Sequence, residues 1–187
     1  MYVLADVYER FLNVLLDEID ALGVGDPADE ATIIGPVIDE PSAQRIQAWI
    51  DEAVDAGARI VRGGERRATL IPPTLLARTT PDMRVECEEV FGPVATIASV
   101  TSLDEAIERT NATRYGLQSG LFTNDVRAIG QAFEGLQVGG VIVNDYPTLR
   151  IDNFPYGGIK DSGFGREGVR YAMDEMSELK VLVVKYR

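Results

Sequence analysis

The sequence has 187 residues, with 18 lysine and arginine residues against 30 aspartate and glutamate residues, and so carries a formal charge of −12. It contains no histidine and one cysteine, which excludes a Ser-His-Asp triad, a Cys-His pair, a histidine-ligated metal and an internal disulfide. The acidic balance argues against nucleic acid or an anionic membrane as a partner. Because no apolar run is long enough to span a membrane and no signal pattern opens the chain, we expect a cytoplasmic globular protein.

Helices and strands are predicted to alternate along the chain, from the spacing of apolar residues and from turn and cap signals. In chain order the predicted elements are helices over 4–22 and 41–56, a strand over 59–62, an extended segment over 69–76, a strand over 94–100, a helix over 102–111, a strand over 117–122, a helix over 125–136, a strand over 139–144, a helix over 169–176 and a strand over 180–186. This alternation favours an α/β fold with a mostly parallel sheet. Without an internal repeat or linker, it predicts a single domain over 1–187.

The segment Glu88-Glu-Val-Phe-Gly-Pro93 is the first candidate for chemistry. Two adjacent acids before an aromatic residue and a Gly-Pro turn could hold a hydrogen-bond acceptor beside a flat ring face. The alternative is a solvated pair of charges next to a core phenylalanine at a turn. Short motifs of this kind often mislead, so composition alone favours the structural alternative.

A glycine-rich segment, with five glycines within residues 157–168, is the second candidate. Glycine permits positive φ and a close approach of the backbone to a neighbour, which would suit a phosphate cradle. However, the segment matches neither the P-loop pattern nor a G-x-G-x-x-G that directly follows a strand. A structural connection between the sheet and a helix is therefore the favoured interpretation.

Taken together, the motifs change this balance. In chain order they are Gly35-Pro36, 88–93, 115–120, 139–144, 155–168 and 175–180. Their combination resembles the C-terminal part of the catalytic domain of the aldehyde dehydrogenase superfamily, and segments 152–158 and 165–172 resemble the branch that includes lactaldehyde and non-phosphorylating glyceraldehyde-3-phosphate dehydrogenases. The resemblance implies an α/β fold with helices flanking a mostly parallel sheet. It also implies a final strand, 180–186, that pairs across a subunit interface, so we expect a homo-oligomer.

The resemblance assigns three residues to the cofactor, which is NAD or NADP in the complete enzyme. Glu89 is expected to hydrogen-bond the nicotinamide ribose, and Phe91 to pack against the nicotinamide ring. Arg45, on the helix after Gly35-Pro36, is the nearest match to a basic residue that the family offers to the ribose side of the cofactor. We expect this chain by itself to bind no cofactor, because the dinucleotide-binding domain of the family lies further upstream.

Three further residues are assigned to the substrate, a small-molecule aldehyde. Asn144 belongs to a strand that ends at the substrate tunnel, and Tyr156 lines that tunnel. Arg150 lies in a variable loop that meets the far end of the substrate. A guanidinium there could pair with a carboxylate or phosphate, or it could simply face solvent.

The catalytic cysteine and the general-base glutamate of the family also lie upstream of the segment that matches residues 1–9. Cys87 is expected to be a bystander, because its acidic neighbours disfavour the thiolate that a nucleophile needs. One hypothesis is that the chain is part of an NAD(P)-dependent enzyme that oxidises an aldehyde to a carboxylic acid, and is inactive by itself. The alternative is a non-catalytic remnant that associates with a full-length relative.

Overall fold

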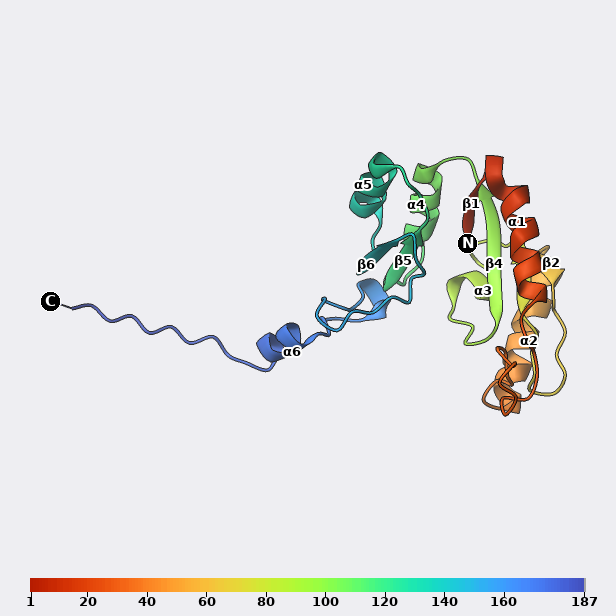
Figure 1. Cartoon of the computed structure of the whole chain (residues 1–187), viewed down its shortest axis with the longest axis horizontal. Coiled ribbons are helices and arrows are strands. Elements are labelled where there is room, and N and C mark those ends of the chain that lie inside the picture. The colour runs from red at the N-terminus through yellow and green to blue at the C-terminus, as the bar shows by residue number, and fades with distance from the viewer. Residues whose placement is uncertain (187) are drawn as a thin grey trace. The chain divides into compact units, whose positions relative to one another are not determined.

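The computed structural model describes residues 1–186 and divides into two compact units (Figure 1). Unit 1 comprises residues 1–106, and unit 2 begins at residue 107. Among the described residues, no helix has the length and apolar character needed to cross a membrane. The single domain predicted over the whole chain stays a prediction.

Unit 1 is built around a four-stranded sheet with the order β1-β4-β3-β2. Its elements in chain order are β1 (Tyr2–Leu4), α1 (Ala5–Asp20), α2 (Glu40–Asp55), β2 (Arg59–Arg62), β3 (Thr74–Ala77), α3 (Arg84–Cys87) and β4 (Val94–Val100), followed by α4 (Leu103–Asn111), which continues into unit 2. Strand β4 pairs in parallel with both β1 and β3, and β2 is antiparallel to β3. The predicted α/β fold with a mostly parallel sheet is thus confirmed.

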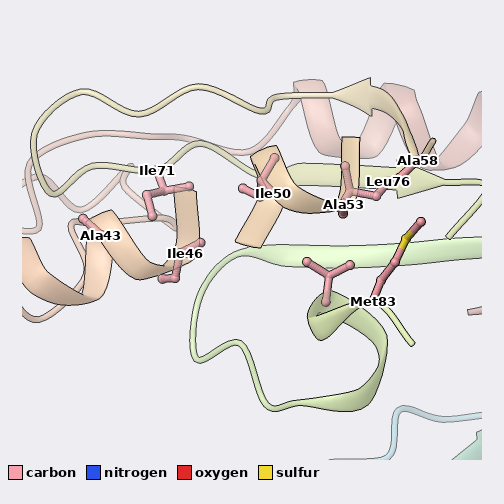
Figure 2. Packing of buried hydrophobic residues seen from close by; sticks show 9 residues of the cluster. Ala43, Ile46, Ile50, Ala53, Ala58, Ile71, Leu76 and Met83 are labelled. Carbon is pink, nitrogen blue, oxygen red and sulfur yellow. The ribbon is translucent and has the colours of Figure 1, made fainter. Parts of the chain in front are cut away.

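The core of unit 1 lies on both faces of this sheet. Strand β3 is buried along its whole length, as a central strand covered on both faces should be. Leu75 and Ala77 pack with α1, whereas Leu76 packs with α2. Figure 2 shows the buried cluster between α2 and the sheet (the α2 cluster), in which Ile46 and Ile50 of α2 are fully buried. An isoleucine side chain contributes about 1.5–3 kcal/mol when it is fully buried, so α2 is firmly anchored.

Helix α2 begins where its capping residue dictates. Asp39 has an extended backbone, and its Oδ1 accepts a hydrogen bond from the Ser42 backbone N–H at 2.8 Å. Pro41 follows in the first turn, where it needs no partner for its nitrogen. Hydrogen bonds from the Ser42 side chain and backbone lower the pKa of the Asp39 carboxyl. The cap is therefore fully effective above the ordinary pKa of aspartate and is lost as the pH falls through the lowered value.

Unit 2 contains much less regular structure. After the end of α4 come β5 (Gln118–Leu121), α5 (Val126–Gly135), β6 (Gly140–Val143), the 3₁₀ helix η1 (Lys160–Ser162) and α6 (Val169–Glu175). Strands β5 and β6 form a two-stranded parallel sheet. Of the sixteen buried apolar residues among those described, only Ala132 belongs to unit 2. Unit 2 thus has almost no hydrophobic core of its own.

The glycine-rich segment packs against this small sheet. A Cβ added at Gly139 would collide with the carbonyl oxygen of Gly157, and one at Gly116 would lie 2.8 Å from the Ile159 side chain. Tyr156 and Glu167 form an antiparallel bridge across the segment. The glycines here allow backbone to lie on backbone, which supports the structural interpretation of this segment.

Apart from shifted bounds, the largest being the segment predicted over 69–76 that forms β3 only at Thr74–Ala77, the predicted elements differ from the structure in four places. Residues 2–4 pair with β4 before the first helix begins, and the short elements α3 and η1 were not predicted. No strand forms over 180–186; these residues are exposed and lie in no helix or strand. A strand needs a neighbour for its backbone groups, and the described part of this chain supplies none there.

Candidate functional site

The loop between α3 and β4, residues 88–93 (the 88–93 loop), carries the first pair of predicted site residues. It is fixed at both ends by backbone hydrogen bonds: the Glu88 N–H donates to the Arg84 carbonyl at 3.0 Å, and the Pro93 carbonyl accepts from the Thr74 N–H at 2.8 Å. In its middle, a Cβ on Gly92 would lie 2.6 Å from Ile46 Cδ1, so the backbone there rests directly on α2. The loop is therefore packed against unit 1 and held at both ends by hydrogen bonds.

Glu89 and Phe91 are the exposed members of this loop. The Glu89 side chain is exposed, whereas Glu88 is half-buried. Phe91 is 78% exposed and has a φ of +50°, in the left-handed region. An L-residue there costs roughly 1–2 kcal/mol, and such strain concentrates where a function requires it. An exposed aromatic ring on strained backbone, two residues from an exposed carboxylate, is a credible ligand-binding pair.

Arg45 reaches this loop from α2. Its Nη2 donates a hydrogen bond of 2.8 Å to the carbonyl oxygen of Val90, the residue between Glu89 and Phe91. The guanidinium carbon also lies 4.7 Å from the centroid of the Trp49 ring. The structure thus brings the three predicted cofactor residues together, with Arg45 turned toward the loop backbone.

The substrate-side residues Arg150 and Tyr156 also lie together, in unit 2. The Arg150 guanidinium carbon is 5.1 Å from the centroid of the Tyr156 ring. Arg150 also forms ion pairs with Glu167 at 2.8 Å and, more loosely, with Asp152 at 3.7 Å. About half of the Arg150 side chain stays exposed, so it remains open to an anion.

Asn144 lies directly after β6 and has a φ of +58°. Its side-chain amide forms two hydrogen bonds with the backbone of Thr123: the Oδ1 accepts from the N–H at 2.9 Å, and the Nδ2 donates to the carbonyl at 3.0 Å. The side chain therefore acts as one further rung of the β5–β6 sheet. In this chain it holds the ends of the two strands together.

Cys87, the one cysteine of the sequence, ends α3 and is half-buried. Its Sγ lies 4.0 Å from the carbonyl oxygen of Asp82, which is a weak contact. Nothing in this geometry changes the interpretation of Cys87 as a bystander.

Sequence reasoning missed the side chains that surround Arg45. Trp49 lies on α2, four residues after Arg45, and was not among the predicted site residues. In the structure its half-buried ring also contacts Arg84, whose guanidinium carbon lies 5.3 Å from the ring centroid. Arg84 in turn forms an ion pair with Glu52. The only available signal was a single tryptophan on a helix that also carries an arginine one turn away.

The mostly parallel sheet flanked by helices defines unit 1 as an α/β fold. The aldehyde dehydrogenase family model matches residues 1–182, and the chain belongs to that family. It is 45% identical over 184 residues to a 3-sulfolactaldehyde dehydrogenase of Priestia megaterium, covering 98% of this chain and 39% of the relative. The family predicted from the motifs is thereby confirmed.

Two of the solved structures that are similar to the chain illustrate the match. Aldehyde dehydrogenase 21 of Physcomitrella patens, in complex with its reaction product succinate, has a TM-score of 0.95 at 43% identity, with 98% of this chain and 38% of that chain covered. The glyceraldehyde-3-phosphate dehydrogenase GapN of Methanocaldococcus jannaschii, complexed with NADP, has a TM-score of 0.89 at 39% identity, with 96% and 39% covered. The second structure supports the predicted branch. The chain spans about two fifths of the length of each of these proteins.

Proposed function

We propose that this chain forms the nicotinamide side and one wall of the substrate tunnel in an NAD(P)-dependent aldehyde dehydrogenase that oxidises an aldehyde to a carboxylic acid. The observation that carries the proposal is the seated 88–93 loop, which exposes Glu89 and Phe91. Membership of the family supports it, as does the NADP complex of a similar structure.

The exposed groups on this loop fit a nicotinamide nucleoside. An exposed carboxylate accepts hydrogen bonds from ribose hydroxyls, and bonds to a charged acceptor are the stronger kind. The exposed face of Phe91 offers a flat apolar surface to an aromatic ring. When bound, the dinucleotide would supply the hydride acceptor. The chain's own part is to hold the ribose and to set the position of the ring.

The substrate is proposed to be a short aldehyde that carries an anionic group. Arg150 is half-exposed beside Tyr156, and a guanidinium pairs well with sulfonate, carboxylate or phosphate. Three similar proteins are named for, or bind, molecules that carry such a group: a 3-sulfolactaldehyde, glyceraldehyde-3-phosphate and the product succinate. Glu167 and Asp152 hold Arg150 in place until an anion competes for it.

Association with another chain is the second proposal, and the apolar surface of unit 2 favours it. Val181, Leu182 and Val183 are each more than four fifths exposed. Exposed apolar patches of this kind drive association, and an extended segment can complete its hydrogen bonds on a sheet edge of another molecule. The partner is a second copy of this chain, or a full-length relative if the chain acts as a non-catalytic remnant.

The first expected result concerns activity. Purified alone, the 187-residue chain should reduce neither NAD⁺ nor NADP⁺ with any aldehyde, because the resemblance places the nucleophile, the general base and the cofactor domain elsewhere. Joined to the upstream part of its own enzyme, it should oxidise an aldehyde with an anionic group faster than an uncharged aldehyde of equal length. Absorbance at the reduced-nicotinamide band measures both. Turnover by the chain alone would contradict the proposal, and Cys87→Ala would show whether that thiol is responsible.

The second expected result concerns oligomeric state. At micromolar concentration the chain should be a dimer or larger, and deletion of residues 180–187 should shift it toward the monomer. Static light scattering after size exclusion measures both species. A monomer whose mass is the same with and without those residues would show that the C-terminal segment does not mediate association.

A further inference from the structure

The strained conformation of Phe91 needs a restraint, and the structure supplies one. The carbonyl of Val90 belongs to the peptide unit that joins Val90 to Phe91. The angle φ of Phe91 is the rotation about the N–Cα bond that joins this peptide unit to the Cα of Phe91. A group that holds the Val90 carbonyl therefore fixes one side of that torsion. Arg45 Nη2 holds it at 2.8 Å. The hydrogen bond thus acts directly on the backbone angle that orients the exposed ring.

The guanidinium of Arg45 is itself held in place. It lies over the ring of Trp49, one turn further along α2, with 4.7 Å between the guanidinium carbon and the ring centroid. Trp49 packs against the buried cluster of unit 1. A cation over an indole ring, with its stem packed along a helix, has few alternative positions. Arg45 therefore transmits the rigidity of α2 to the middle of the 88–93 loop.

Trp49 also contacts the helix that precedes the 88–93 loop. The guanidinium carbon of Arg84, the first residue of α3, lies 5.3 Å from the centroid of the Trp49 ring, and Arg84 forms an ion pair with Glu52 of α2. Further along, Gly92 rests on Ile46. Helix α2 thus contacts this part of the chain before, within and after the exposed pair, and Arg45 makes its contact at Val90, between Glu89 and Phe91.

We propose that Arg45 is a positioning residue, which sets the backbone of Glu89 and Phe91 through the Val90 carbonyl, in place of the direct cofactor contact that the family resemblance assigns to it. The cofactor-binding role of Glu89 and Phe91 rests on the proposed function. The hydrogen bond from Arg45 to the Val90 carbonyl does not rest on it, so an experiment can refute either claim without refuting the other.

Proteolysis of the 187-residue chain tests the restraint. Chymotrypsin should cut the Phe91–Gly92 bond only after the loop opens, and the same dipeptide at Phe164–Gly165, whose phenylalanine is fully exposed, serves as an internal reference. Arg45→Met keeps the stem but removes every donor. It should raise the ratio of the two cleavage rates about tenfold, the change that loss of a hydrogen bond to a charged group implies. Arg45→Lys keeps a charged donor and should raise the ratio less.

Gln47→Ala is the matched control. Gln47 lies on the same helix and donates to the carbonyl of another loop, at Gly64, with a distance of 2.9 Å. The Gln47→Ala variant should leave the cleavage ratio within about twofold of the ratio for the native chain. A hydrogen bond to the loop at Gly64 affects the local opening of that loop and not of the 88–93 loop. The restraint is refuted if Arg45→Met leaves the ratio unchanged, or if Gln47→Ala raises it equally.

A second measurement, in the longer enzyme that contains this chain, separates positioning from binding. Arg45→Met should lower the rate of hydride transfer at saturating NADP⁺ while the Kd of NADP⁺ stays nearly constant, and Arg45→Lys should restore part of the rate. A weaker Kd with an unchanged saturated rate would make Arg45 a direct ligand and overturn the proposal. If the longer enzyme with native Arg45 reduces no NAD(P)⁺, the proposed function fails, and the cleavage ratio still decides whether Arg45 holds the loop.

Discussion

Replacement of Glu89 by glutamine, in the enzyme that joins this chain to its upstream half, should slow hydride transfer by about a hundredfold. The change preserves size and one acceptor oxygen but removes the charge that strengthens hydrogen bonds to the ribose hydroxyls. A ring displaced by about 1 Å from its reaction partner loses rate on this scale. Binding of the aldehyde should change much less. Stopped-flow measurement of NAD(P)⁺ reduction gives the rate directly.

Glu88→Gln is the matched control for this experiment. Glu88 has the same side chain one residue earlier, but it is half-buried, whereas Glu89 is exposed. We expect its replacement to leave the hydride-transfer rate nearly unchanged. Equal rates for Glu89→Gln and the native enzyme, or a larger loss at Glu88, would show that the other carboxylate faces the ribose.

Replacement of Ile46 by alanine should lower the free energy of unfolding of unit 1 by about 2–5 kcal/mol, the usual range when a buried isoleucine is truncated. Ile46 is completely buried within the α2 cluster shown in Figure 2, and its Cδ1 lies beneath Gly92. The cavity would therefore open directly under the 88–93 loop. Urea denaturation followed by Trp49 fluorescence reports this unit, because Trp49 is the only tryptophan in the sequence.

Ile38→Ala provides the comparison. Ile38 is 92% exposed in the turn before α2, so its truncation leaves no cavity and should change the free energy by less than about 0.5 kcal/mol. If the two variants shift the urea midpoint equally, the side chain of Ile46 does not stabilise unit 1 as much as its burial indicates.

The long elements of this fold were predictable because each has a local cause. The predicted strand over 94–100 coincides with β4, and the helix predicted over 41–56 differs from α2 by one residue at either end. Strand β1 was not predictable, because three residues adjoining a helix show no period of their own and form a strand only by pairing with β4. Helix α3 has four residues, too few to display a helical stripe.

The candidate site was predictable only in part, for a similar reason. Glu89 and Phe91 stand in a contiguous motif that a single sequence displays. The hydrogen bond from Arg45 to Val90 joins residues 45 positions apart, and it exists only because the cores beneath α2 and β4 bring them together. The pairing of Arg150 with Glu167 likewise depends on the folded-back segment that ends at the Tyr156–Glu167 bridge.

The scarcity of buried side chains in unit 2 has a thermodynamic consequence. A unit with a sheet of only two strands and a single buried apolar residue among those described, Ala132 of α5, is at the margin of independent stability in water. Unit 1, with its two clusters, is not. We therefore expect the isolated chain to lack a single melting temperature: warming should disorder Arg150 and Tyr156 first, while Glu89 and Phe91 should keep their native conformation until the sheet of unit 1 melts.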